Sequence, residues 1–205
     1  MQGYIINLNR VKEEDLIVTI ISKENLYTLY RFYGARHGII NLGFKIDYEV
    51  EASTKGGISR LKDVIHIGYN WINNPELLRL WQNFLMLFFK HLKESEEIGN
   101  FYFNLLYEAE CKWDKQNPKR VAVEAYVKLL EHEGRLHKEP YCFLCSGVIQ
   151  DDISLIRAFL PTHPQCTHTL AINKKALEEL FINKSSLFLS NKEIGRLWNI
   201  MLEGL

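Results

Sequence analysis

The chain contains 205 residues, of which 47% are hydrophobic and 24% are charged, and these proportions exclude a disordered or fibrous protein. Its 25 basic residues are balanced by 25 acidic residues, so a nucleic-acid site would have to be a local patch. Apolar-rich stretches without a charge, such as Leu80–Phe89 with ten residues, are too short for a membrane span, which needs about 20 apolar residues. No secretory signal is visible at the N-terminus, and we expect a cytoplasmic protein without a membrane span.

The first 70 residues predict an all-β unit. They hold seven of the 12 glycines and none of the five prolines, and their turns separate short runs of β-branched and aromatic residues. Five such runs leave no room for crossover helices, and a flat sheet of this size would expose its edges. We therefore expect a closed barrel of the OB type. The candidate strands are Tyr4–Asn9, Leu16–Ser22, Leu26–Tyr33, Phe44–Ala52 and Ile58–Ile67.

A helical pattern replaces the strand pattern after residue 73. Asn74 and Asn117 each precede a proline, which is typical of a helix start. Apolar residues then recur at spacings of three and four, which indicates helices with one broad buried face. The first three helices should form a bundle, and the last two should pack back onto it. The predicted helices are 74–92, 100–113, 117–134, 174–181 and 191–202.

Three of the four cysteines lie in a pattern typical of a zinc site. Cys142 and Cys145 form a C-x2-C pair, and after 17 residues His163 and Cys166 repeat the two-residue spacing. Zinc binds four nitrogen or sulfur ligands in a tetrahedron, and two short loops can supply them. We expect these four residues to hold a structural Zn2+. His168 is a rival for the fourth ligand, and a zinc-free remnant in which these residues merely pack is the alternative.

The same segment imitates a zinc deaminase, because His137 and Glu139 precede the C-x2-C pair. In a deaminase the glutamate and the cysteines come from separate helices, whereas Glu139 lies three residues before Cys142. Four available ligands would also close the metal to a substrate. The sequence contains no nucleophile elbow, Walker loop or dinucleotide-binding glycine pattern, so it favours a protein that is not an enzyme.

The predicted fold class is α+β, with an N-terminal OB-fold β-barrel followed by a helical bundle with an embedded zinc-binding module. We expect the barrel over residues 1–72, the bundle over 73–138, the zinc-binding module over 139–170 and C-terminal helices packing on the bundle over 171–205.

The strand predicted at 26–33 is a candidate surface for single-stranded DNA. Alternation with a period of two places Tyr27, Arg31 and Tyr33 on one face. We expect this face, together with Arg36 after the next turn, to form an aromatic and basic surface on which bases stack. The alternative is ordinary barrel packing in which Arg31 extends its charge to solvent.

A second candidate surface is basic. It comprises Lys112, Lys115, Lys119 and Arg120, opposed only by Asp114. Lys119 and Arg120 fall in a first helical turn, where positive charge opposes the helix dipole, so stability alone would not select them. A phosphate or an acidic peptide would explain these residues, and a solvated corner is the alternative.

Two segments resemble the start of the RecO recombination mediator family, namely the opening MQGYIINLNRVKEEDLIVTIIS and the YGAR motif at 33–36. The expected order of barrel, bundle and zinc module is similar to that family too, with the module opened by Leu136-x3-Pro140-x-Cys142-x2-Cys145. The resemblance implies a non-enzymatic, nucleoid-associated DNA repair protein that binds and anneals single-stranded DNA. It also implies two partners, RecR and the acidic C-terminal tail of the single-stranded-DNA-binding protein. We expect that tail to dock at the basic patch.

An adaptor that mainly contacts proteins and binds DNA weakly is the alternative function, and the zero net charge favours it. The sequence leaves open the oligomeric state, the DNA path and the RecR stoichiometry.

Overall fold

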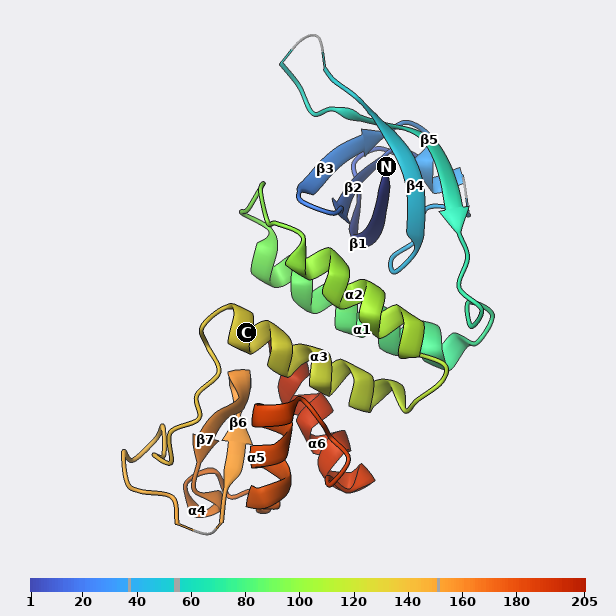
Figure 1. The fold of residues 1–205 in the computed structure, drawn as a ribbon. Helices are drawn as coiled ribbons and strands as arrows, with labels where there is room; N and C mark the ends of the chain where they lie inside the picture. Colours follow the sequence, from blue (N-terminus) through green and yellow to red (C-terminus); the bar gives the residue numbers. More distant parts are fainter. Residues whose placement is uncertain (37, 54–55, 151) are drawn as a thin grey trace. The chain divides into compact units, whose positions relative to one another are not determined.

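A computed structural model describes residues 1–36, 38–53, 56–150 and 152–205 (Figure 1). The chain divides into two compact units, Met1–Asp114 and Lys115–Leu205. Each unit has its own set of buried apolar side chains. Within the described ranges, every helix is too short or too polar to cross a membrane.

Five strands close into a barrel in the first unit: β1 (Gln2–Arg10), β2 (Leu16–Ile21), β3 (Leu26–Arg31), β4 (Lys45–Glu51) and β5 (Arg60–Ile67). Their order around the barrel is β1-β2-β3-β5-β4, and β3 and β5 run parallel where Tyr30 pairs with Arg60. Buried aliphatic side chains such as Val18, Leu29 and Ile46 fill the interior. The predicted OB-type barrel is confirmed, and each strand ends within two residues of its expected bounds.

Two helices of the first unit follow the barrel, α1 (Pro75–Leu92) and α2 (Phe101–Lys112). The Asn74 side chain caps α1 by accepting hydrogen bonds from the backbone N–H groups of Glu76 and Leu77, as the Asn-Pro start predicts. The buried Trp81 indole donates to the Gly43 carbonyl at 2.9 Å. Gly43 has a φ of 88°, which glycine adopts without strain. The connection between β3 and β4 can therefore present this carbonyl to α1.

A buried ion pair joins α2 to the barrel. The Lys45 ammonium on β4 lies 3.0 Å from a Glu110 carboxylate oxygen, and the two side chains are only 6% and 17% exposed. The Tyr4 hydroxyl donates to the same carboxylate oxygen. The ammonium also lies over the Tyr4 and Tyr107 rings, 5.3 and 4.6 Å from their centroids. Burial, together with the neighbouring Glu110 carboxylate, raises the pKa of Tyr4 far above its ordinary value.

The second unit combines helices with a short hairpin: α3 (Pro118–His132), β6 (Ser154–Ile156), β7 (Leu160–Thr162), α4 (Pro164–Thr167), α5 (Lys174–Asn183) and α6 (Asn191–Leu202). α3 packs against α6 and α5. The tip of the β6–β7 hairpin carries Phe159, which is fully buried. Its ring lies edge-on to Tyr126 at 4.9 Å and stacks on Phe181 at 6.4 Å. The hairpin is therefore anchored in the core of the helices.

The five long helices agree with the prediction, but they are shared between the units. α1 and α2 belong to the first unit, whereas α3, which the sequence groups with them in one bundle, belongs to the second. The finer boundaries at residues 72, 138 and 170 stay predictions. Periodicity does not reveal β6, β7 or α4, because elements of three or four residues do not establish a period.

Candidate metal centre and nucleic-acid interface

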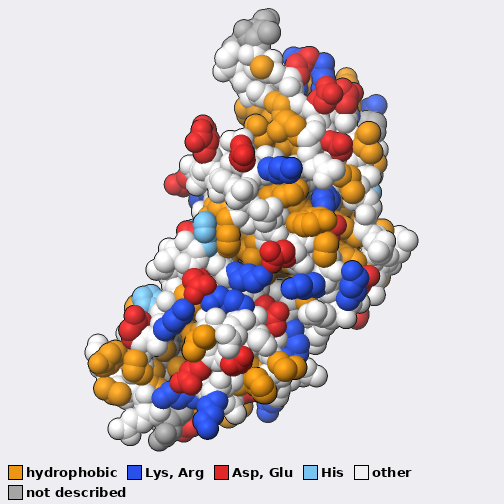
Figure 2. Space-filling view, in the orientation of Figure 1, with side chains coloured by type: hydrophobic (Ala, Val, Ile, Leu, Met, Phe, Trp, Pro, Cys, Tyr) orange, Lys and Arg blue, Asp and Glu red, His pale blue; other side chains and the backbone are white. Residues whose placement is uncertain are grey.

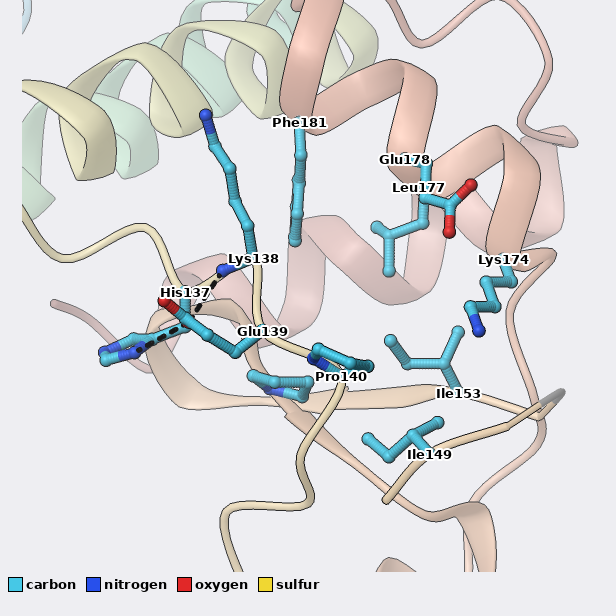
Figure 3. Close-up of a pocket in the computed structure, with 11 residues that line it drawn as sticks. His137, Lys138, Glu139, Pro140, Ile149, Ile153, Lys174, Leu177, Glu178 and Phe181 are labelled. Atoms are coloured by element: carbon cyan, nitrogen blue, oxygen red, sulfur yellow. Dashed lines mark hydrogen bonds and ion pairs between the residues drawn. The ribbon is translucent and has the colours of Figure 1, made fainter.

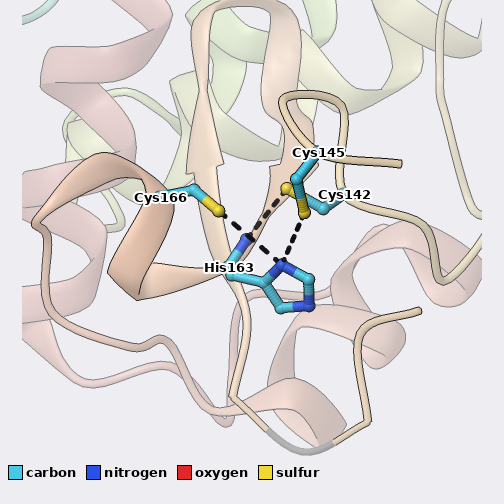
Figure 4. A group of neighbouring side chains, drawn as sticks. All are labelled: Cys142, Cys145, His163 and Cys166. Atoms are coloured by element: carbon cyan, nitrogen blue, oxygen red, sulfur yellow. Dashed lines mark hydrogen bonds between the residues drawn. The ribbon is translucent and has the colours of Figure 1, made fainter. Parts of the chain in front are cut away.

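Four residues of the second unit converge on one point. Cys142, Cys145, His163 and Cys166 each place a potential ligand atom within 4.8 Å of the other three (Figure 4). The two thiols of the C-x2-C pair lie on a hairpin in which the Cys142 N–H donates to the Gly147 carbonyl at 2.8 Å. His163 precedes α4, and Cys166 lies within it. Ligand sulfur atoms around tetrahedral zinc are about 3.8 Å apart, as zinc–sulfur bonds of about 2.3 Å require, and the observed spread fits this geometry.

The imidazole of His163 is oriented for metal binding through Nδ1. This nitrogen lies 3.3 Å from the Cys145 sulfur and 3.8 Å from the Cys166 sulfur. The other nitrogen, Nε2, lies 3.1 Å from the Val148 carbonyl. A proton donated to that carbonyl leaves the Nδ1 lone pair free, and metal-bound histidines commonly have such a partner. Among the described residues, His168 is not part of the group and instead ends α4 in a left-handed conformation.

The thiols of the group differ in acidity. Burial raises the pKa of Cys142, but the backbone N–H groups of His163, Cys145 and Leu144 outweigh burial and lower that pKa to about 6. Burial and the nearby sulfur atoms of Cys145 and Cys142 raise the pKa of Cys166 to about 11. Clustered thiols of this kind become thiolates on a bound cation. The donor set of three sulfurs and one imidazole suits zinc, and four protein ligands leave no open position for a substrate.

The structure divides the four residues predicted to bind DNA: Tyr33 and Arg36 are exposed, whereas Tyr27 and Arg31 are half-buried. Leu29 lies on the face expected to be outside, yet it is a buried member of the barrel core, and Tyr27 packs against that core. Arg31 is half-buried and donates to the Leu61 carbonyl at 2.9 Å. Tyr27 and Arg31 therefore face the barrel interior, which is the packing alternative.

Two exposed aromatic residues, Phe32 and Tyr33, follow directly after the end of β3. Phe32 is 46% exposed and lies edge-on to Tyr30 at 4.9 Å. The Arg60 guanidinium lies 5.0 Å over the Phe32 ring. Arg36 lies 5.1 Å over the ring of Tyr33, which is also exposed. Two cation–aromatic pairs are thus available for bases and phosphates. The sequence would have identified Phe32 if the other alternating face of residues 26–33 had been assigned to solvent. Arg60 lies on β5, and no local sequence pattern links it to Phe32.

A carboxylate fixes the backbone beneath these rings. The Tyr30 hydroxyl donates to Asp15 at 2.5 Å, and the Tyr33 N–H donates to it at 2.8 Å. These hydrogen bonds hold the pKa of Asp15 below its usual range. The aromatic surface is therefore held in place before any ligand binds.

Both exposed guanidinium groups also have acidic neighbours. Arg36 pairs with Glu14 at 2.5 Å, and Arg60 lies 3.5 Å from Glu51. These side chains are at least one third exposed, so the pairs contribute little to stability. A phosphate can therefore exchange with either carboxylate at low cost.

The predicted basic patch is divided between the units: Lys112 ends α2 in the first, and Lys115, Lys119 and Arg120 lie in the second. The Arg120 guanidinium donates to the backbone carbonyls of Ser186 and Leu189. It therefore holds the turn between α5 and α6, a structural contribution that the sequence does not reveal.

A pocket of the second unit lies beside α5 (Figure 3). Its apolar lining includes Pro140, Ile149 and Leu177, and four charged side chains surround it, namely Lys138, Glu139, Lys174 and Glu178. Lys138 is paired with Glu131 at 2.9 Å, and Lys174 donates to the Gln150 carbonyl. Among the described residues of the lining there is no serine, threonine or cysteine.

Comparison with known proteins identifies the barrel. Residues 1–72 match the family model described as RecO N terminal, and this range covers all five barrel strands. A search of curated proteins finds no match to the chain. The matched range contains both segments that carry the sequence resemblance. Residues 1–72 are therefore similar to the RecO N-terminal domain, and this match supports a RecO family assignment.

Proposed function

We propose that this chain is a RecO-type mediator of recombinational DNA repair that binds and anneals single-stranded DNA without catalysing a reaction. The observation that carries the proposal is the pair of cation–aromatic contacts, Arg60 with Phe32 and Arg36 with Tyr33, on an OB barrel that matches RecO N terminal. Bases would stack on the rings, and the guanidinium groups would bind phosphates. The proposed DNA surface retains Tyr33 and Arg36 from the sequence prediction. Phe32 and Arg60 take the place of Tyr27 and Arg31, which face the barrel interior.

The test is fluorescence-polarisation binding of a labelled oligothymidylate to the full chain. Phe32→Ala with Arg60→Ala should remove one stacking platform, worth about 1–3 kcal/mol per base, and should lower the log–log salt slope by about 0.7 for one phosphate. Ile65→Ala with Lys23→Ala is the matched control, because it also removes one exposed apolar and one exposed basic side chain. Equal binding by the two double variants would place the DNA path elsewhere.

We further propose that the ligand group of Cys142, Cys145, His163 and Cys166 holds a structural Zn2+. Zinc would supply a cross-link and no catalysis, because the four ligands complete its tetrahedron. The cross-link would tie the hairpin at 142–147 to the segment around α4.

The second candidate function is an adaptor that contacts other proteins and binds DNA weakly, and one turn of the second unit favours it. Leu187 and Phe188 are 75% and 66% exposed, whereas Ser186 and Leu189 on either side are buried. Arg120 holds both flanking carbonyls. Two large apolar side chains on a fixed turn are typical of a docking surface.

The acidic tail of the single-stranded-DNA-binding protein is the partner that we propose for this turn. Lys119, in the first turn of α3, would attract its carboxylates, and Leu187 and Phe188 would contact its apolar residues. Lys119→Glu and, separately, Leu187→Ser with Phe188→Ser should each abolish tail-peptide binding without unfolding the chain. If both variants still bind the tail peptide, the turn is not the binding site for the tail. RecR remains an expected partner of the family, with no residue assigned.

A further inference from the structure

Both guanidinium groups of the proposed DNA surface are paired with carboxylates of the same chain. Arg36 lies 2.5 Å from Glu14, and Arg60 lies 3.5 Å from Glu51. Basic and acidic side chains also lie next to one another over the barrel, at the top of Figure 2. The planar fork of a guanidinium binds carboxylates and phosphates in the same way. In the DNA-free protein the two glutamates therefore occupy positions that phosphates need.

The backbone keeps both carboxylates close to their arginines. The Ala35 N–H donates to the Glu14 carbonyl at 2.9 Å, so the loop between β1 and β2 is tied to the residue before Arg36. Glu51 and Arg60 are partners in the ladder between β4 and β5, where facing side chains lie within reach of each other. A carboxylate that is displaced by a phosphate thus stays near its guanidinium and can return to it.

Glu51 is held by a second cation as well. The Lys62 ammonium donates to this carboxylate, and Lys62 lies two residues after Arg60 on β5, so the two basic side chains share a face. The contact with Lys62 holds the pKa of Glu51 below its usual range, and the carboxylate is therefore charged at neutral pH. A strand that approaches this surface meets basic groups whose charge is already largely neutralised.

We propose that Glu14 and Glu51 are intramolecular competitors of the DNA phosphates and limit the affinity of this surface for single strands. The inference rests on the proposed DNA-binding function and adds two residues that act against it. A positioning role would have the opposite effect. If the carboxylates held the guanidinium groups in place for DNA, their removal would weaken binding, whereas the removal of a competitor strengthens it.

The test is fluorescence-polarisation binding of a labelled oligothymidylate to the full chain at low salt. Glu14→Gln and Glu51→Gln should each strengthen binding about twofold to fivefold, the range that exposed ion pairs allow, and the double variant should strengthen it about tenfold. Glu13→Gln with Glu49→Gln is the matched control, because it removes the same charges from the same loop and the same strand. Both control residues are exposed, and neither forms an ion pair with a described residue.

A double-mutant cycle shows whether the competition acts through the arginine. In an Arg36→Ala background, Glu14→Gln should change the affinity no more than Glu13→Gln does, because the guanidinium that it would release is gone. Circular dichroism of each variant establishes that it is folded before its affinity is compared. A gain from Glu14→Gln that persists in full without Arg36 would overturn the proposal, since the effect would then be one of net charge alone.

The arginine variants separate this proposal from the proposed function. If Arg36→Ala and Arg60→Ala each bind the oligonucleotide as the wild type does, the DNA surface itself is wrong and the competition is wrong with it. If these variants weaken binding while the glutamine variants do not strengthen it beyond the control, only the competition is refuted. Weaker binding by the glutamine variants would also refute it and would assign the carboxylates a positioning role.

Discussion

The buried ion pair between Lys45 and Glu110 makes the stability of the first unit depend on two charges at once. Lys45→Met keeps the length of the side chain and removes the ammonium that lies 3.0 Å from the Glu110 carboxylate. Within the described residues, that carboxylate then keeps the Tyr4 hydroxyl as its hydrogen-bond donor. Breaking a buried pair from one side costs about 3–5 kcal/mol, because the remaining charge stays buried. We expect a loss of this size, since the two side chains are only 6% and 17% exposed.

Urea unfolding followed by tryptophan fluorescence measures this loss, because Trp71, Trp81 and Trp113 are buried in the first unit. Lys45→Met with Glu110→Leu removes both charges and should restore most of the stability. Lys62→Met is the control, since Lys62 pairs with a glutamate in solvent and the side chains are 48% and 40% exposed. It should cost less than about 1 kcal/mol. The reasoning is refuted if Lys45→Met costs no more than this control or if the double variant is less stable than the single one.

Three further predictions concern the second unit. His163→Ala should abolish bound zinc in elemental analysis, whereas His168→Ala should retain it. Zinc that is retained in His163→Ala and lost in His168→Ala would identify His168 as the fourth ligand. In the metal-free protein, thiolate absorbance of Cys142 should titrate with a midpoint near pH 6 and should vanish in the Cys142→Ser variant. Folding lowers this pKa, so the thiolate contributes its full stability above the unfolded pKa of about 8.5. That contribution is lost as the pH falls through 6. If the free energy of unfolding of the metal-free protein does not fall over this range, the low pKa of Cys142 is contradicted. Arg120→Ala should lower the free energy of unfolding of this unit by about 2–3 kcal/mol, as the loss of hydrogen bonds from a charged donor implies. It should also speed proteolytic cleavage near residue 187, and an unchanged cleavage rate would mean that the turn is held by other contacts.

The strands and long helices could be predicted because their signals are local. Glycine-rich turns between β-branched runs locate the five strands, and the Asn-Pro starts at Asn74 and Asn117 locate α1 and α3, where both asparagine side chains cap the helix. The grouping of the helices is not a local property. Apolar periodicity shows that a helix has a buried face but does not identify the partner of that face. The assignment of α3 to the second unit therefore could not be predicted from its own residues.

The inward orientation of Tyr27 and Arg31 on β3 could not be predicted either, because it also depends on contacts that are not local. Alternation determines which residues share a face, but it does not determine which face is inside. Both faces of β3 carry apolar or aromatic side chains, with Leu29 on one and Tyr30 on the other. The deciding fact is a cross-strand pairing, in which Leu29 lies opposite the buried Val18 of β2. That pairing depends on the register of two strands, which neither strand specifies alone.

The metal-ligand group could be predicted from the sequence, whereas the structural role of Arg120 could not. A two-residue spacing brings two ligands into one loop in almost any fold, so the cysteines are informative before their surroundings are known. Basic residues at a helix start are informative only if nothing in the fold already uses them. Arg120 is used, because it holds carbonyls 66 and 69 residues further along the chain, whereas no described acidic residue forms an ion pair with Lys119. The positive charge of Arg120, which opposes the dipole of α3, is thus explained by its hydrogen bonds to these carbonyls. The charge of Lys119 has no such explanation, and an acidic partner bound there would stabilise the helix.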